Sequence, residues 1–132
     1  MEDTSALALQ QLEQKVTQRV TELFQNYLGH QPQHVSCKLT EKTLTIVAED
    51  SITRVEQFLA GRGRQELAQQ VRLSLLKTLE PQLTYLVEEV VNVPVLDVIG
   101  DSAFDTGRTS FVTILAAEPD VLKDFPSSSS DK

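Results

Sequence analysis

The sequence predicts an α+β fold in which four antiparallel strands form one sheet and helices cover one of its faces. Two observations predict it. Two long segments carry apolar residues at helical spacing, and each is followed later in the chain by a pair of short segments with strand-like patterns. The expected order is helix, hairpin, short helix, long helix, hairpin. Two hairpins can join into one sheet, and the apolar stripes of the helices must then pack on one of its faces.

The first helix is expected over residues 5–28. Its apolar side chains recur at spacings of three and four: Leu9, Leu12, Val16, Val20, Leu23, Tyr27 and Leu28. Gly29 is suitably placed as the left-handed residue that ends the helix. After a polar break, apolar and polar residues alternate over 35–39 and again over 44–48, which predicts the first hairpin.

A short helix and a long helix are expected next. Thr53 and Glu56 have the spacing of a capping box, and the Gly-Arg-Gly sequence at 61–63 interrupts the short helix. Beyond this break the apolar residues keep helical phase, although Pro81 must remove one backbone hydrogen bond. We therefore expect either a kink near Glu80 or two abutting helices.

The second hairpin is predicted by two β-branched, apolar segments, residues 93–99 and 109–116. Between them lie Asp101-Ser102 and Asp105-Thr106-Gly107, which are typical of turns. The sheet face away from the helices is expected to be more apolar than a solvated surface requires, with Thr43, Thr45 and Val47 among its residues. We therefore expect a homodimer that buries this face or the long helix.

The chain is expected to form one domain over residues 1–118, followed by a flexible tail over 119–132. A length of 132 residues suits a single hydrophobic core. The last segment is polar and contains four consecutive serines, so it has few apolar groups to hold it in place. Each half of the domain pairs a long helix with a hairpin, and an internal duplication stays open because the halves match only in pattern.

Charge and composition exclude several classes of protein. Twelve Lys and Arg against nineteen Asp and Glu give a net charge of −7, which disfavours nucleic acid and anionic lipid as partners. The single cysteine permits neither an intramolecular disulfide nor a thiolate metal cluster. The acidic start lacks the features of a secretion signal, and no apolar run is long enough to cross a membrane. We expect a soluble cytoplasmic protein with no cofactor, no metal and no membrane-inserted segment.

Three segments carry a resemblance to a known family. They are Tyr27-Leu28-Gly29-His30-Gln31-Pro32 followed by Val35, then Gly63-Arg64 through Leu67 to Val71-Arg72, and finally Val93, Val95 and Asp101 leading to Thr106-Gly107. They resemble the successive signatures of the bacterial MpsC-like family over residues 7–116. That family, long catalogued as a domain of unknown function, is associated with a cation-translocating, membrane-potential-generating system linked to inorganic-carbon uptake. The resemblance implies an accessory role rather than a chemistry.

Positive charge gathers around the start of the long helix. The residues are Arg54, Arg62, Gly63, Arg64 and Arg72. A helix N-terminus exposes unpaired N–H groups and carries partial positive charge, so this cluster can hold a phosphate, a carboxylate or bicarbonate. Its spacing matches neither a Walker loop nor a dinucleotide fingerprint. The competing interpretation is a sharp turn whose arginines pair with surplus carboxylates.

Other candidate groups have plainer explanations. Glu88 and Glu89 lie near the C-terminal end of the long helix, where they form either a solvated acidic face or a site for a cation or a basic partner. His30 and His34 are four residues apart, but the intervening proline makes a shared helical face improbable. Cys37 occupies an inward strand position with no adjacent base in sequence, so we expect a buried apolar residue rather than a nucleophile.

Asp101, Thr106 and Gly107 belong to the turn that carries the family motif. Asp105 completes a triplet that also occurs in aspartic proteases, but Asp and Gly are the residues that a tight turn requires. Three function classes follow. The first is a non-catalytic accessory or regulatory protein that contacts a membrane cation or inorganic-carbon transport system. The alternatives are a small-anion or nucleotide sensor at the arginine cluster and an enzyme that uses Asp101, Asp105 or another carboxylate pair.

Overall fold

The computed structural model describes residues 4–123. Its elements are α1 (Thr4–Leu28), β1 (His34–Thr40), β2 (Thr43–Glu49), α2 (Arg54–Gly61), α3 (Gln65–Val91), β3 (Val95–Ala103), β4 (Arg108–Leu115) and α4 (Asp120–Lys123). Apart from the added α4, this is the order that the sequence predicts. The α+β fold class is therefore confirmed.

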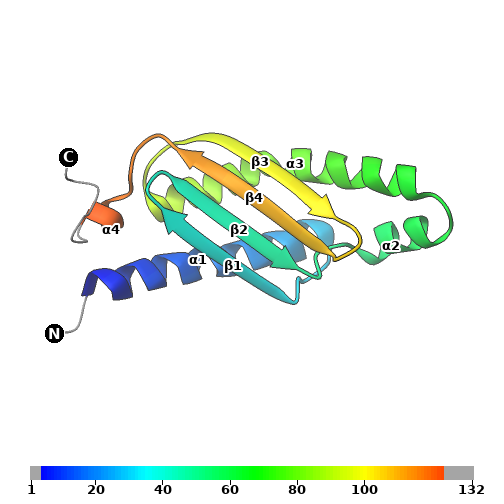
Figure 1. Cartoon of the computed structure of the whole chain (residues 1–132), viewed down its shortest axis with the longest axis horizontal. Helices are drawn as coiled ribbons and strands as arrows, with labels where there is room; N and C mark the ends of the chain where they lie inside the picture. The colour runs from blue at the N-terminus through cyan, green and yellow to red at the C-terminus, as the bar shows by residue number, and fades with distance from the viewer. Residues whose placement is uncertain (1–3, 124–132) are drawn as a thin grey trace.

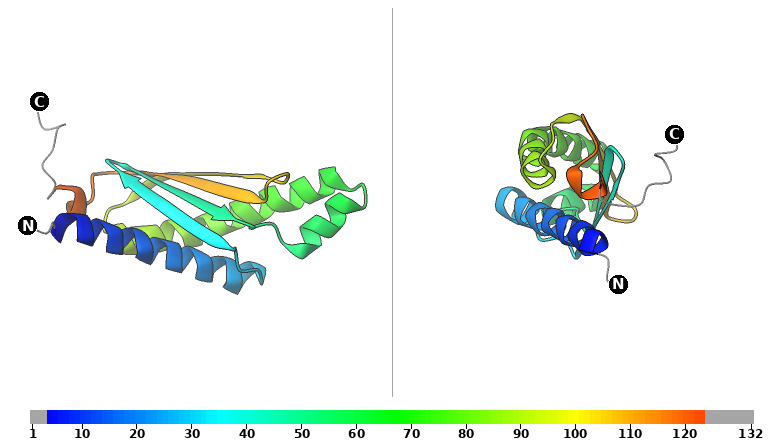
Figure 2. Two further views of the ribbon diagram at one scale, coloured as in Figure 1. Left: turned by 60° about the horizontal axis from the view of Figure 1, so that its bottom comes forward. Right: turned by 90° about the vertical axis from the view of Figure 1, so that its left-hand side faces the viewer.

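The four strands form one antiparallel sheet in the order β1-β2-β4-β3. The two hairpins therefore join through β2 and β4, where Ile46 lies opposite Phe111. Figure 1 shows the long helices α1 and α3 behind the sheet, and the tilted view of Figure 2 places both on the same side of it. One face of the sheet is thus covered by helices, as predicted, and the other is open.

The hydrophobic core lies between this pair of helices and the inner face of the sheet. Its fully buried members come from every layer: Val16, Val20 and Phe24 in α1, Leu83 and Val87 in α3, and Leu44, Ile46, Ala48 and Phe111 in the sheet. Spacings of four in the helices and of two in the strands bring these side chains to one interior. The same periodicities are the signal that predicts the fold.

The predicted ends of α1 and α2 agree with the structure. Gly29 has a φ of 64°, and its N–H donates to the carbonyl of Gln25 at 3.1 Å, which ends α1 in a left-handed turn. At α2, Thr53 Oγ1 accepts from the N–H of Glu56 at 3.3 Å, and the Glu56 carboxylate accepts from the N–H of Thr53 at 3.0 Å. The capping box is therefore formed in full.

The long helix α3 runs without interruption through Pro81, so the alternative of two abutting helices is wrong. Pro81 is exposed, whereas its neighbours Leu79 and Leu83 are buried. Burial of this apolar stripe holds the helix together where one backbone hydrogen bond is missing. Asn92, with a φ of 62°, ends the helix.

The second hairpin differs from its prediction at the turn. Asp101 and Ser102, expected in the turn, lie in β3 opposite Ser110 and Thr109 of β4. The hydroxyl groups of Ser102 and Thr109 are 2.7 Å apart and hydrogen-bonded, so these polar residues extend the ladder instead of ending it. The turn occupies 104–107 and includes Thr106 and Gly107, as expected.

The short helix α4 forms in the segment where the sequence predicts a tail. Val121 and Leu122 pack against the core, and the Leu122 N–H donates to the carbonyl of Pro119 at 3.0 Å. These two apolar residues, surrounded by polar ones, extend the packed chain beyond residue 118. The remainder of the expected tail, residues 124–132, lies outside the described residues.

Candidate functional site

Arg72 of the predicted arginine cluster is buried in an ion pair with Glu56. Its Nε donates to Glu56 Oε2 at 2.7 Å and its Nη2 to Glu56 Oε1 at 2.6 Å, and only 2% and 1% of the two side chains are exposed. Nη2 also donates to the carbonyl of Ser51 at 2.9 Å. Arg72 therefore joins α3 to α2 and to the segment that follows β2 through Nε and Nη2. Its Nη1 is buried and has no hydrogen-bond partner among the residues that the structure describes.

The other arginines of the cluster are at the surface. Arg54, Arg62 and Arg64 are all exposed. The Arg62 guanidinium lies 4.9 Å from the centroid of the Phe58 ring, which is a cation–π contact. Gly63, with a φ of 78°, forms the left-handed turn between α2 and α3. The sequence therefore located the turn correctly. Arg72 pairs with a carboxylate and Arg62 lies over an aromatic ring.

A hollow of about 330 Å³ lies beside this turn. Its lining comes from the β2–α2 loop, from α2, from the start of α3 and from the β3–β4 turn: Asp50, Ile52, Gln57, Ala60, Gln65, Gln69, Phe104, Asp105 and Gly107. Two features that are far apart in the sequence, the helix break and the family-motif turn, thus meet here. Two carboxylates and three amides line the hollow, and no arginine of the described chain does, so its charge favours a cation or a neutral polar group over an anion.

Ser51 connects the family-motif turn to the buried ion pair. Its N–H and its hydroxyl both donate to the Gly107 carbonyl, at 2.8 and 2.9 Å, and its own carbonyl accepts from Arg72. Its hydroxyl also lies 2.7 Å from that of Thr109. The sequence shows Glu56 only as a capping residue, because its partner is sixteen residues away on another helix.

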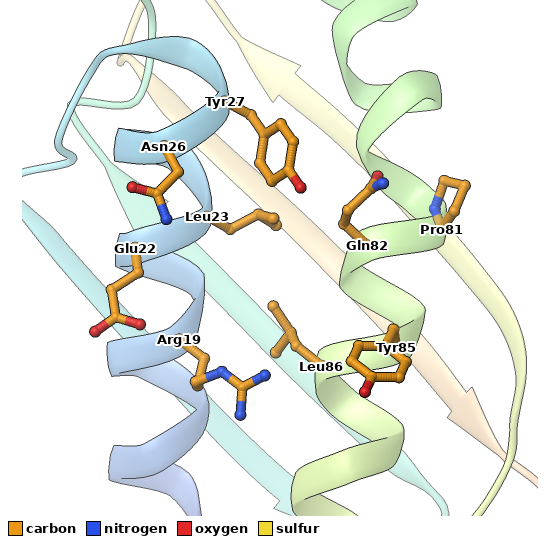
Figure 3. Close-up of a pocket in the computed structure, with 9 residues that line it drawn as sticks. All are labelled: Arg19, Glu22, Leu23, Asn26, Tyr27, Pro81, Gln82, Tyr85 and Leu86. Carbon is orange, nitrogen blue, oxygen red and sulfur yellow. The ribbon is translucent and has the colours of Figure 1, made fainter.

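A second hollow, of about 340 Å³, lies between α1 and α3, and we call it the α1–α3 groove. Figure 3 shows its lining: Arg19, Glu22, Leu23, Asn26, Tyr27, Pro81, Gln82, Tyr85 and Leu86. The nearly buried Leu23 and Leu86 form an apolar base. Tyr27 from α1 and Tyr85 from α3 flank it, and 60% and 62% of these two residues are exposed. Tyr27, which the helical periodicity placed with the apolar stripe, is therefore a surface residue.

The two glutamates near the end of α3 have separate roles. Glu88 Oε2 accepts from the N–H of Val95 at 2.8 Å and so ties the end of α3 to the start of β3. Glu89 pairs with Arg19 of α1 at 2.7 Å, beside the α1–α3 groove. The Arg19 guanidinium, and then the Tyr85 hydroxyl, hold the pKa of Glu89 below its usual value, and the bond to Glu89 raises the pKa of Tyr85.

The remaining candidate groups have local partners. His30 Nε2 lies 2.7 Å from the carbonyl of Asp50, and His34 is exposed in β1. Burial, followed by the nearby Glu13 carboxylate, raises the pKa of the Cys37 thiol from 9.0 to about 12, so the group stays a neutral thiol at pH 7. Asp101 accepts from the N–H of Ser102 at 2.8 Å. No group of three or more His, Cys, Asp or Glu within residues 4–123 is arranged to hold a metal ion.

Comparison with known families adds one finding. The family model described as "Na+-translocating membrane potential-generating system (MpsC)" matches residues 8–117. The chain belongs to the MpsC family. The match confirms the resemblance found in the sequence, and it includes every residue of the α1–α3 groove. No curated protein and no solved structure matches the chain.

The MpsC family description refers to a membrane system, so we asked whether any helix of this chain could cross a membrane. Among the described helices, none combines the length with the apolar character that crossing a bilayer requires. The two long helices place their apolar stripes on the sheet. The α1–α3 groove lies between these helices, and Figure 3 shows the strands behind it.

Proposed function

We propose that this MpsC-family chain is a non-catalytic accessory or regulatory protein that acts through contacts with other proteins. Its proposed partner is a component of a membrane cation or inorganic-carbon transport system. The family description supports the link to such a system. The observation that carries the contact role is the α1–α3 groove, in which two exposed tyrosines flank an apolar base.

The composition of the groove suits a protein partner. Tyrosine gives a large contact area for little loss of side-chain entropy, and its hydroxyl can keep a hydrogen bond when the ring is buried. The Arg19–Glu89 ion pair and Glu22 supply a polar rim around the apolar base. A groove between two helices accepts the apolar face of a further helix, in which a few central side chains carry most of the binding energy.

Truncating both tyrosines is expected to release the partner. In cells that contain the native membrane system, the tagged wild-type chain is expected to co-purify with a membrane subunit in mild detergent. The double variant Tyr27→Ala, Tyr85→Ala is expected to retain that subunit at least about tenfold less, because each lost aromatic contact weakens binding. Gln25→Ala is the matched control, since Gln25 is exposed on α1 but does not line the groove.

The contact role would be contradicted if the wild-type chain purifies without a membrane subunit after chemical crosslinking. It would also be contradicted if the double variant retains as much of that subunit as the control. Far-ultraviolet circular dichroism of each variant establishes that both are folded, so that lost retention reports contact and not unfolding.

The proposal includes a homodimer that buries the open face of the sheet. Val47, Val112 and Ile114 form the apolar centre of this face on β2 and β4, flanked by threonines. Sedimentation equilibrium is expected to show a species of about twice the 14.7 kDa monomer, and Val112→Asp is expected to shift it to the monomer because it places a charge in the buried face. Gln70→Asp, on the exposed side of α3, serves as control. The homodimer proposal would be wrong if the wild-type chain is a monomer at every concentration measured.

A further inference from the structure

The free edge of β3 is suited to bind a segment of a partner protein. This inference rests on the proposed contact role and specifies the chemistry of that segment. β3 is an edge strand, with only β4 beside it. The register shifts between Val95 and Asp97, and from Asp97 to Ala103 every residue has a partner in β4. Alternate N–H and C=O groups of an antiparallel edge strand point away from its neighbour. Within residues 4–123, no other segment hydrogen-bonds to this edge between Leu96 and Gly100.

Two adjoining hollows follow this edge, between β3 and the flank of α3. Their volumes are about 570 and 520 Å³. Both are lined by Lys77 and Glu80 of α3, while β3 contributes residues 95–98 to one and Gly100 to the other. They share these two lining residues and so adjoin along the strand, and we call the pair of hollows the channel. Figure 1 shows β3 at the border of the sheet with α3 running behind it.

A channel between a strand edge and a helix flank is the arrangement in which proteins bind extended peptides by adding a strand. An added strand would bond to the backbone of β3 and place alternate side chains over α3. On that side, Leu73 and Leu96 are large apolar residues that are more than half exposed, and both line the channel. They offer contact to apolar or β-branched side chains of the incoming segment.

Charge on the other side of β3 decides between occupants. Asp97, Ile99 and Asp101 point to the open face of the sheet at alternate positions, and 62% of Ile99 is exposed. If a second copy paired with β3 in the antiparallel register centred on Ile99, Asp97 of each copy would lie opposite Asp101 of the other. Like charges directly opposite each other destabilise a strand pair. The net charge of −7 also favours a basic partner for this edge.

We infer that β3 binds an extended segment of a different protein, in which basic side chains at two alternate positions flank an apolar one. The backbone of that segment pairs with Asp97–Asp101 as a fifth strand of the sheet. Its two basic side chains lie opposite Asp97 and Asp101, its central apolar side chain contacts Ile99, and its other side chains enter the channel beside α3.

The probe for this site is a synthetic peptide with blocked ends, Thr-Lys-Val-Val-Thr-Lys-Thr, and its analogue with both lysines replaced by glutamate. Residue-resolved amide hydrogen exchange of the full chain is the readout. The lysine peptide is expected to slow exchange at alternate amides between Leu96 and Asp101, and the glutamate peptide is not. The double variant Asp97→Lys, Asp101→Lys is expected to bind the lysine peptide about tenfold more weakly and to prefer the glutamate peptide.

The control is the double variant Glu41→Lys, Glu66→Lys, which changes the net charge by the same amount at positions away from β3. It is expected to keep the preference for the lysine peptide.

Several results would overturn the inference. One is equal protection by the two peptides, or protection by neither. Another is protection of these amides in the chain alone: if it grows with protein concentration, a second copy occupies the edge, and if it disappears when residues 124–132 are removed, that segment does. If the wild-type chain retains the membrane subunit but neither peptide slows exchange at β3, the proposed function stands and this inference is wrong. Peptide binding by a chain that recruits no membrane subunit does the reverse.

Discussion

Replacing Arg72 by methionine is expected to lower the free energy of unfolding by about 3–5 kcal/mol. The change leaves the Glu56 carboxylate, which is 1% exposed, without its counter-charge and without two hydrogen bonds. Methionine keeps much of the apolar stem of arginine, so the loss reports the charge and the hydrogen bonds more than the packing. Urea unfolding at pH 7, followed by circular dichroism, measures it.

Arg108→Met is the matched control for this prediction. Arg108 pairs with Glu49 at 2.8 Å, a distance close to that of the buried pair, but 56% of its side chain is exposed. An exposed pair of this kind contributes about 0–1 kcal/mol. Adding Glu56→Gln to Arg72→Met is expected to recover part of the loss, because the buried charge is removed. A loss below about 1 kcal/mol for Arg72→Met alone would show that the ion pair does not hold α2 against α3.

Gly100→Ala is expected to lower the free energy of unfolding by about 1–3 kcal/mol. The added Cβ would lie 2.7 Å from Cδ1 and 2.8 Å from Cε1 of Phe111, the residue opposite Gly100 in β4. The Phe111 ring is fully buried in the core, so it has little room to move aside. Alanine otherwise suits a strand better than glycine, so a loss of stability is diagnostic of this close approach.

Gly61→Ala provides the comparison, since nothing lies within 4 Å of the Cβ that it would add and Gly61 does not have a positive φ. This change is expected to be neutral or to stabilise the protein by up to about 1 kcal/mol, by reducing the freedom of the unfolded chain. Both variants are compared by urea unfolding. If Gly100→Ala is as stable as Gly61→Ala, the Phe111 ring does not restrict this position.

Most of the fold was predictable because it follows from local periodicity. The spacing of Val16, Val20 and Leu23 defined α1, and the alternation around Ile46 defined its strand. The prediction failed where long-range contacts override local preference. Asp101-Ser102 has the composition of a turn, but its cross-strand partners keep it in β3. Val121 and Leu122 are too short an apolar pair to predict α4, and their packing against the core stabilises it.

Less of the candidate site was predictable. The motifs predicted the family, and the glycine-rich break predicted the turn between α2 and α3. The sequence showed that arginines cluster near the start of α3. It could not show that Arg72 forms an ion pair with Glu56, because that pairing depends on how two helices pack. Helical spacing likewise placed Tyr27 among the apolar residues, although the stripe that contacts the sheet is narrower and leaves its ring exposed. A site built from several segments can be predicted only when the tertiary arrangement of those segments is known.

Pro81 divides α3 into two parts that are expected to differ in the free energy of local unfolding. Since proline has no N–H, the Lys77 carbonyl lacks its usual donor, and the ladder of helical hydrogen bonds is interrupted there. Residues 82–91 lie on the core beside α1, whereas the first turns of α3 pack on α2 beyond the sheet (Figure 2). We expect α2 and the first turns of α3, which end before the core residue Leu76, to behave as one cooperative unit that unfolds at lower free energy than the rest. A partner bound near this end of the molecule would then stabilise a subdomain without altering the core.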